Sequence, residues 1–155
     1  MDGSRPASED DIAYLLVQLG FHVARRFTER LAPLGLEPRQ FGMLTRLAAN
    51  EGTSQQAIGE LIGLNPTRMV FLVDELEKQG LVERRRNPDD RRSYALYLTG
   101  QGQATLSEAQ RVSTEHDRGI GASLTGAQRR ELAALLRQVA DEQGISEDSL
   151  PGPPG

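Results

Sequence analysis

The most distinctive chemistry in this 155-residue sequence is a cluster of cations between Lys78 and Arg92. Three consecutive arginines (84–86) precede a turn-forming segment (87–90), and two more follow it. This interval holds six cations and three anions, although the whole chain carries a formal net charge of -4 at pH 7. Arginine presents a planar fork of donors that matches the geometry of phosphate oxygens. The cluster therefore predicts a local phosphate-binding surface on an otherwise acidic protein.

Catalytic, metal and redox chemistry have little support in the sequence. The absence of cysteine excludes disulfides, thiol redox sensing and cysteine-ligated zinc. The two histidines, His22 and His116, are far apart, and the glycines at 100 and 102 lack the third glycine of a dinucleotide site. No apolar run is long enough to span a membrane, and no signal peptide is recognisable. We expect a cytoplasmic protein with no catalytic residues, no metal and no cofactor.

A helix and a hairpin position the cations. Asn65 suits an N-cap and Pro66 suits the first helical position. Apolar residues then recur at steps of three and four until Gly80, which predicts an amphipathic helix with a stop. Beyond Gly80 the period changes, and short strands are predicted from residue 81 and over 94–98. The arginines would therefore surround the tip of a β-hairpin that follows a helix.

Two further helices are predicted upstream, at 38–50 and 54–62. A tight turn at Gly63 joins the second of them to the Asn65 helix. A short helix, a turn containing glycine and a second amphipathic helix form a helix-turn-helix. With the hairpin as a wing, residues 36–99 are expected to form one winged helix-turn-helix lobe.

Long helical segments flank this lobe. Residues 8–35 predict a helix that begins at an N-cap Ser8, and its apolar residues lie on more than one face, as in helices that pack on a second chain. Residues 100–143 predict two more helices. We expect residues 1–7 and 144–155 to be disordered, and residues 146–155 form a Pro/Gly-rich tail with no core-forming residues.

The order of these elements resembles the MarR family of bacterial winged helix-turn-helix regulators from about Asp11 to Gln143. The segment Asp90-Arg91-Arg92, followed by Leu98-Thr99, is similar to the wing signature of that family. The resemblance implies a mainly α fold with a small β wing, in which a winged helix-turn-helix core is joined to N- and C-terminal dimerisation helices. It also implies a homodimer, a pseudo-palindromic operator in double-stranded DNA, and repression relieved by a small aromatic or lipophilic ligand.

The N-terminal half of the Asn65 helix is expected to read a DNA groove. Arg68 would either contact guanine in a bidentate manner or contact a phosphate. Val70 and Phe71 depart from the polar or basic residues usual in the family. Either both touch thymine methyl groups or Phe71 folds back on its neighbours. Ser54, Gln55 and Gln56 would either contact phosphates or serve only as solvated cap residues. The expected DNA-binding residues of the helix-turn-helix are Ser54, Gln55, Gln56, Asn65, Pro66, Thr67, Arg68 and Phe71.

The wing contributes the remaining expected DNA contacts. Arg92 resembles the family arginine that enters the minor groove, whose negative potential attracts guanidinium groups. Asp90 would orient Arg92, or the two would form a purely structural pair, and Arg91 is the alternative minor-groove residue. Side chains alternate along a strand, so Arg84 and Arg86 are expected to share one face and to contact DNA.

A ligand pocket is expected where the first helix meets the lobe, as in the family. The candidate lining residues are His22, Arg25, Arg26, Phe41 and Met43. A guanidinium or imidazole beside aromatic and sulfur side chains could hold an aromatic carboxylate. Each residue also has an ordinary structural explanation in the core, at the solvated surface or at a subunit interface.

Two other functions remain open at this stage. The protein could bind DNA constitutively, without a ligand, or it could be a winged-helix module that binds protein instead of DNA. DNA binding would fall steeply with salt because phosphates release counterions. A dimer held by apolar helices would not dissociate under the same change.

Overall fold

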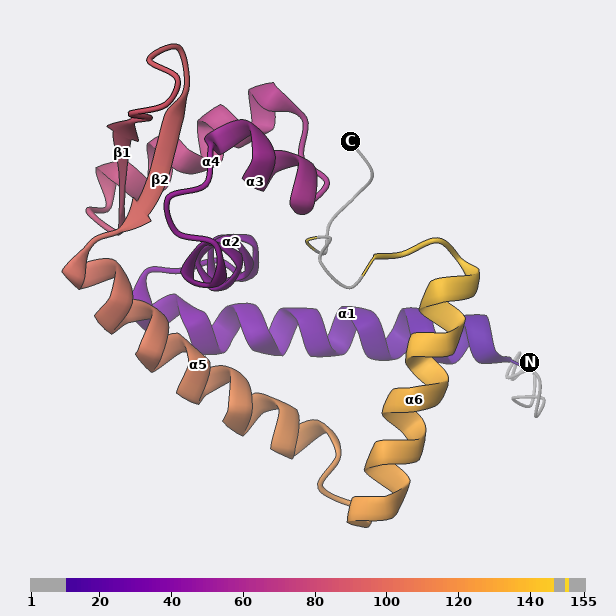
Figure 1. Ribbon diagram of the computed structural model, residues 1–155. Helices are drawn as coiled ribbons and strands as arrows, with labels where there is room; N and C mark the ends of the chain where they lie inside the picture. Colours follow the sequence, from indigo (N-terminus) through magenta and orange to yellow (C-terminus); the bar gives the residue numbers. More distant parts are fainter. Residues whose placement is uncertain (1–10, 147–149, 151–155) are drawn as a thin grey trace, which may run out of the picture.

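The computed structural model describes residues 11–146 and residue 150 (Figure 1). The elements in chain order are α1 (Ile12–Leu31), the 3-10 helix η1 (Ala32–Leu34), α2 (Pro38–Ala49), α3 (Gln55–Leu61), α4 (Pro66–Lys78), β1 (Val82–Arg86), β2 (Tyr94–Leu98), α5 (Gly100–Ile120) and α6 (Gly126–Glu142). The predicted class, mainly α with a small β wing, is confirmed. Figure 1 shows α2, α3, α4 and the hairpin gathered into one lobe, while α1 and α5 extend away from it.

Helix α4 begins and ends where its sequence predicts. The Asn65 side chain accepts a hydrogen bond from the Arg68 backbone N–H at 2.9 Å, and Pro66 is the first helical residue. Gly80 has a φ of 73°, a left-handed conformation that favours glycine after a helix end. These three local signals fix the length of the helix that faces the expected DNA site.

The wing is an antiparallel pair in which Val82 lies opposite Leu98 and Arg86 lies opposite Tyr94. The other edge of β2 is hydrogen-bonded to the chain just before α3. The backbone N–H of Leu96 donates to the Thr53 carbonyl at 3.1 Å, and its carbonyl accepts from Gly52 at 2.9 Å. The wing is therefore joined to the helix-turn-helix by backbone hydrogen bonds as well as by packing.

One hydrophobic core fills the lobe, and α5 starts against it. Buried side chains come from the end of α1, from α2, α3 and α4, from both strands and from the first half of α5. At Gly102, near the start of α5, an added β-carbon would overlap the backbone carbonyl oxygen of Leu81. This close approach positions α5 directly beneath the wing.

The two flanking helical segments leave apolar side chains uncovered. Helix α1 buries only Leu31, and α6 buries no residue. The exposed large apolar residues of these helices are Ile12, Tyr14, Leu15, Leu16, Val17, Leu19 and Phe21 on α1 and Leu132, Leu135 and Leu136 on α6. No helix in the described part of the chain is long and apolar enough to cross a membrane.

The expectation of a C-terminal tail without core contacts is wrong at Leu150. Its backbone N–H donates to the Ile62 carbonyl at 3.3 Å, and its side chain packs against the core beside Gly42. The predicted N-cap Ser8 and the expected disordered N-terminus lie outside the described residues. Of the expected disordered C-terminus, only residues 144–146 and Leu150 are described. Helix α1 begins at Ile12, with Asp11 at its N-cap position.

Candidate nucleic-acid interface

Helix α4 presents two faces of opposite character. Its apolar stripe, formed by Met69, Leu72, Val73 and Leu76, lies in the core. On the other side Asn65, Pro66 and Thr67 are exposed at the helix start, and Arg68 is half-buried. Phe71 is 66% exposed, so it does not fold back on its neighbours. The open N-terminal half of α4 is the part of the lobe that sequence reasoning assigned to a DNA groove.

The expected contacts on α3 lie beside this surface. Ser54 caps α3, because its hydroxyl accepts from the Ala57 backbone N–H at 3.1 Å. Gln55 and Gln56 line a groove of about 300 Å³ between α3 and α4, together with Val70. Helices α3 and α4 therefore line one groove, to which α3 contributes Gln55 and Gln56 and α4 contributes Pro66 and Val70.

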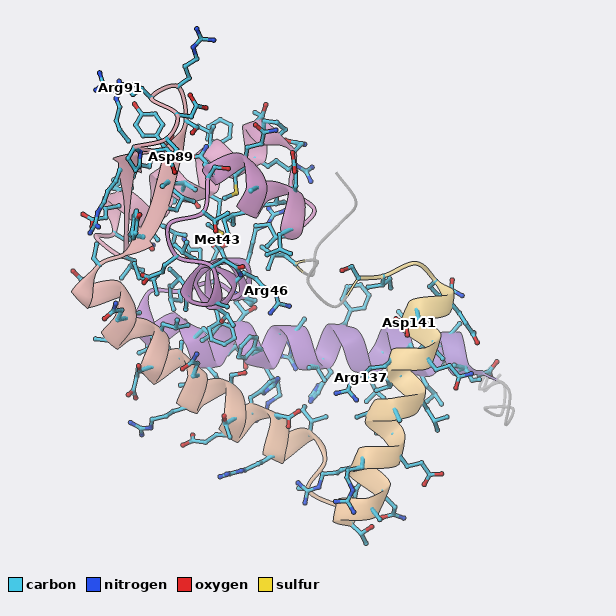
Figure 2. The ribbon with its side chains drawn as sticks, viewed as in Figure 1. Met43, Arg46, Asp89, Arg91, Arg137 and Asp141 are labelled. Atoms are coloured by element: carbon cyan, nitrogen blue, oxygen red, sulfur yellow. The ribbon has the colours of Figure 1, made fainter. Side chains whose placement is uncertain are left out.

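The hairpin tip holds two unpaired guanidinium groups. Asp90 accepts a hydrogen bond from the Arg92 backbone N–H at 3.0 Å, and Asn87 accepts one from the Asp89 backbone N–H at 3.0 Å. Asp90 therefore shapes the turn, and the expected pair between its carboxylate and the Arg92 guanidinium is not formed. Arg91 and Arg92 are exposed and have no ion pair within the described residues. Figure 2 shows Arg91 at the tip, pointing away from the lobe.

Arg86 braces the base of the tip. Its Nη1 donates to the Arg91 carbonyl at 2.7 Å, and its guanidinium lies 5.4 Å from the centre of the Tyr94 ring. Arg86 remains exposed. Its charge is therefore available to an anion, while its hydrogen bond links the two sides of the turn.

Arg84 does not point into solvent. Its side chain is 17% exposed and pairs with Asp74 at 2.7 Å and with Glu77, both on α4. Its Nε donates to Gln55 Oε1 at 2.8 Å. These contacts correct the expectation that the Arg84 guanidinium is free to contact DNA alongside Arg86.

The five predicted ligand-binding residues do not form one pocket. Met43 is fully buried in the core of the lobe, as its position in Figure 2 also shows. His22, Arg25 and Arg26 are exposed on α1, and Arg25 pairs with Glu29 at 3.6 Å. Phe41 alone is half-buried at the junction between α1 and the lobe. Periodicity identified the elements that meet there but not the side chains that face one another.

Sequence reasoning missed His116, which lies at this junction. Its ring stacks on Phe27 with centroids 5.1 Å apart, and Phe27 meets Phe41 edge-on at 5.6 Å. His116 is 8% exposed, and its Nε2 has no hydrogen-bond partner within the described chain. The available signal was its spacing, because His116 continues the buried positions Leu106 and Ala109 along α5.

The surroundings of His116 favour the neutral imidazole. Burial lowers the pKa of His116, and the nearby Arg30 and Arg26 guanidinium groups lower it further. A hydrogen bond with the Val23 backbone and the charge of Asp117 raise this pKa but do not compensate. In the neutral imidazole the proton is on the nitrogen that bonds to the Val23 backbone, so the free Nε2 beside two aromatic rings can accept a hydrogen bond in an apolar setting.

The chain is similar to transcriptional regulators in sequence and in structure. A sequence model of the MarR family matches residues 34–93. The putative transcriptional regulatory protein for the hcr operon of Thauera aromatica is 32% identical over 130 residues, which cover 79% of this chain and 78% of that protein.

Two solved structures extend the similarity over most of the chain. The transcriptional repressor CouR bound to a 23-mer DNA duplex is 33% identical, with a TM-score of 0.78, and the match covers 88% of this chain and 99% of that chain. CouR from Rhodococcus jostii RHA1 bound to p-coumaroyl-CoA is 29% identical, with a TM-score of 0.73, and the match covers 88% and 96%.

Proposed function

Because this chain belongs to the MarR family of transcriptional regulators, we propose that it is a homodimeric repressor that binds a pseudo-palindromic DNA operator and is released by a small aromatic or lipophilic ligand. The observation that carries the DNA-binding part is the shared surface of α4 and the wing. The N-terminal half of α4 is open, and the unpaired Arg91 and Arg92 lie at the tip of the adjoining hairpin.

In this proposal the start of α4 enters a major groove. Asn65, Thr67 and Arg68 would reach base edges or phosphates. Ser54 and Gln56 would contact the neighbouring phosphates of the DNA backbone. The exposed Phe71 would contact thymine methyl groups, which are the apolar feature of the major groove. Arg92 or Arg91 would enter the adjacent minor groove from the wing.

The dimer part of the proposal is supported by the uncovered apolar faces of α1 and α6. Phe21 is 77% exposed and Leu135 is 54% exposed. An exposed apolar surface of this extent on long helices is typical of a protein interface. A two-fold dimer would present two α4 helices, and we expect half-sites about one helical turn, or ~10 bp, apart.

The ligand part is supported by the junction between α1, α2 and α5. Phe27, Phe41 and His116 provide aromatic faces and a neutral nitrogen, with Arg26 and Arg30 close enough to influence the pKa of His116. An aromatic group with a carboxylate or thioester would match these side chains, and CouR binds an aromatic CoA thioester. A ligand bound here would shift the equilibrium between two separations of the DNA-binding lobes.

The first test is selection of random duplex DNA on the purified protein, with sequencing of the bound pool. Recovery of an inverted repeat with one-turn spacing would support the dimeric repressor. The enriched duplex then serves as the probe for release by aromatic carboxylates and their CoA thioesters. Failure to enrich any sequence at low salt would refute operator binding and favour the protein-binding module. Enrichment without release would leave a constitutive DNA binder.

A further inference from the structure

Arg84 is the residue at which the three elements expected to meet DNA come together. It lies on β1, and its side chain contacts α3 through Gln55 and α4 through Asp74 and Glu77. We propose that Arg84 is a positioning residue for DNA binding: it holds the wing at a fixed angle to α4 and neutralises the acidic residues of that helix. The inference rests on the proposed DNA-binding function and assigns Arg84 no contact with DNA.

The geometry of the contacts is that of a clamp with several attachment points. Glu77 accepts from the Arg84 backbone N–H at 2.9 Å and also from its guanidinium, so one carboxylate holds both the strand and the side chain. Asp74 lies 2.7 Å from Nη1, and Gln55 Oε1 lies 2.8 Å from Nε. Asp74 and Glu77 share Nη1, Gln55 binds Nε, and Glu77 also holds the backbone N–H, so rotation of the hairpin relative to α4 would break several of these contacts together.

The electrostatics of α4 explain why such a clamp is needed. Asp74 is 55% exposed and Glu77 is 34% exposed, and both project from the helix that would approach a polyanion. Uncompensated carboxylates on this helix would repel phosphates. The Arg84 guanidinium, only 17% exposed, supplies the compensating charge from the wing. The contacts that hold the wing therefore also reduce the repulsion between α4 and DNA phosphates.

Removal of a carboxylate distinguishes this role from direct DNA contact. If Arg84 contacts phosphate, Glu77→Gln removes a repelling anion and frees the guanidinium, so DNA affinity should rise. If Arg84 positions the wing, the same substitution loosens the clamp, and affinity should fall even though α4 then carries one carboxylate fewer. The two roles thus predict opposite signs for one substitution that preserves side-chain size.

The experiment measures binding of a fluorescent duplex, enriched by selection on the wild-type protein, to the full chain at fixed salt. The variants are Glu77→Gln, Arg84→Gln, their double mutant and Glu83→Gln. Glu83 is a matched control, because it is a carboxylate on the same strand whose partner is Arg85. Arg84→Lys tests the geometry, since an ammonium group is a point charge and lacks the planar fork of guanidinium.

We expect Glu77→Gln and Arg84→Gln each to weaken DNA binding by about 2- to 30-fold, the usual range for residues that couple two elements. The double mutant should bind no more weakly than Arg84→Gln, because both changes break the same clamp. Arg84→Lys should bind DNA more weakly than the wild type, as Arg84→Gln does. Glu83→Gln should bind at least as tightly as the wild type. Urea unfolding of Glu77→Gln should show a folded protein.

Two results would overturn the inference. If the wild type binds its duplex and Glu77→Gln binds it equally or more tightly, Arg84 is not a clamp. Losses that add in the double mutant would show that the two residues act separately. Failure of the wild type to bind any duplex would instead refute the proposed function, and the clamp with it.

Discussion

Substitution of Arg92 by alanine tests whether the wing approaches DNA. The side chain is exposed and has no ion pair within the described residues, and only its backbone N–H is used, in the turn with Asp90. Alanine keeps that N–H and removes the charge. We therefore expect weaker DNA binding with little change in the free energy of unfolding, within about 0.5 kcal/mol for a surface site of this kind.

The salt dependence supplies the magnitude. A dimer carries two wings, so Arg92→Ala removes two cations from the complex. Each phosphate contact contributes about 0.9 to the slope of log affinity against log salt, and the slope should fall in magnitude by about 1.8. When the salt concentration rises fourfold, from about 50 to about 200 mM, the ratio of wild-type affinity to variant affinity should fall roughly 12-fold, which is 4 raised to the power 1.8.

Fluorescence anisotropy with the selected duplex at several salt concentrations measures this slope. Arg111→Ala is the matched control, because Arg111 is an exposed arginine on α5 that pairs with Glu108 at 2.9 Å, away from the wing. It removes the same charge and should leave the slope unchanged. A wild-type slope and affinity in Arg92→Ala would remove Arg92 from the mechanism and refute the argument from its exposure.

Two further predictions concern stability. Gly102→Ala should lower the free energy of unfolding by about 1–3 kcal/mol in urea titrations, because its β-carbon would overlap the Leu81 carbonyl, whereas Gly119→Ala, which meets open space, should raise it by up to about 1 kcal/mol. Since the pKa of His116 is lowered from 6.5 in the folded state, the unfolded chain takes up a proton first on acidification. Thermal stability should therefore fall as the pH drops through about 6.5. His116→Gln should reduce this pH dependence, and an unchanged profile in His116→Gln would contradict the assignment.

Local signals were sufficient to predict α4 and the wing. Asn65, Pro66 and Gly80 each act on the backbone within one helical turn, so their effects can be read from sequence alone. The change from helical to alternating periodicity after Gly80 likewise reports which residues face a core. Such signals identify an element and its buried face without any knowledge of the rest of the chain.

Side-chain partners between elements could not be predicted in the same way. Arg84 reads as one more cation of the cluster, and its burial depends on how closely the wing packs against Asp74 and Glu77. Likewise, the stacking of His116 on Phe27 depends on the angle at which α5 crosses α1. Periodicity places each residue on a face of its helix and leaves the opposing side chain unspecified.

The pairing of the wing also bears on aggregation. Strand β2 is bonded to β1 on one edge and to the chain before α3 on the other, through Leu96 and the bridge between Ser54 and Ala95. Within the described residues, β1 is therefore the outer strand of the sheet. Outer strands can pair with strands of other molecules, and charged side chains oppose this. Arg85 and Arg86, the exposed arginines of this strand, should thus discourage wings of separate molecules from joining edge to edge at high protein concentration.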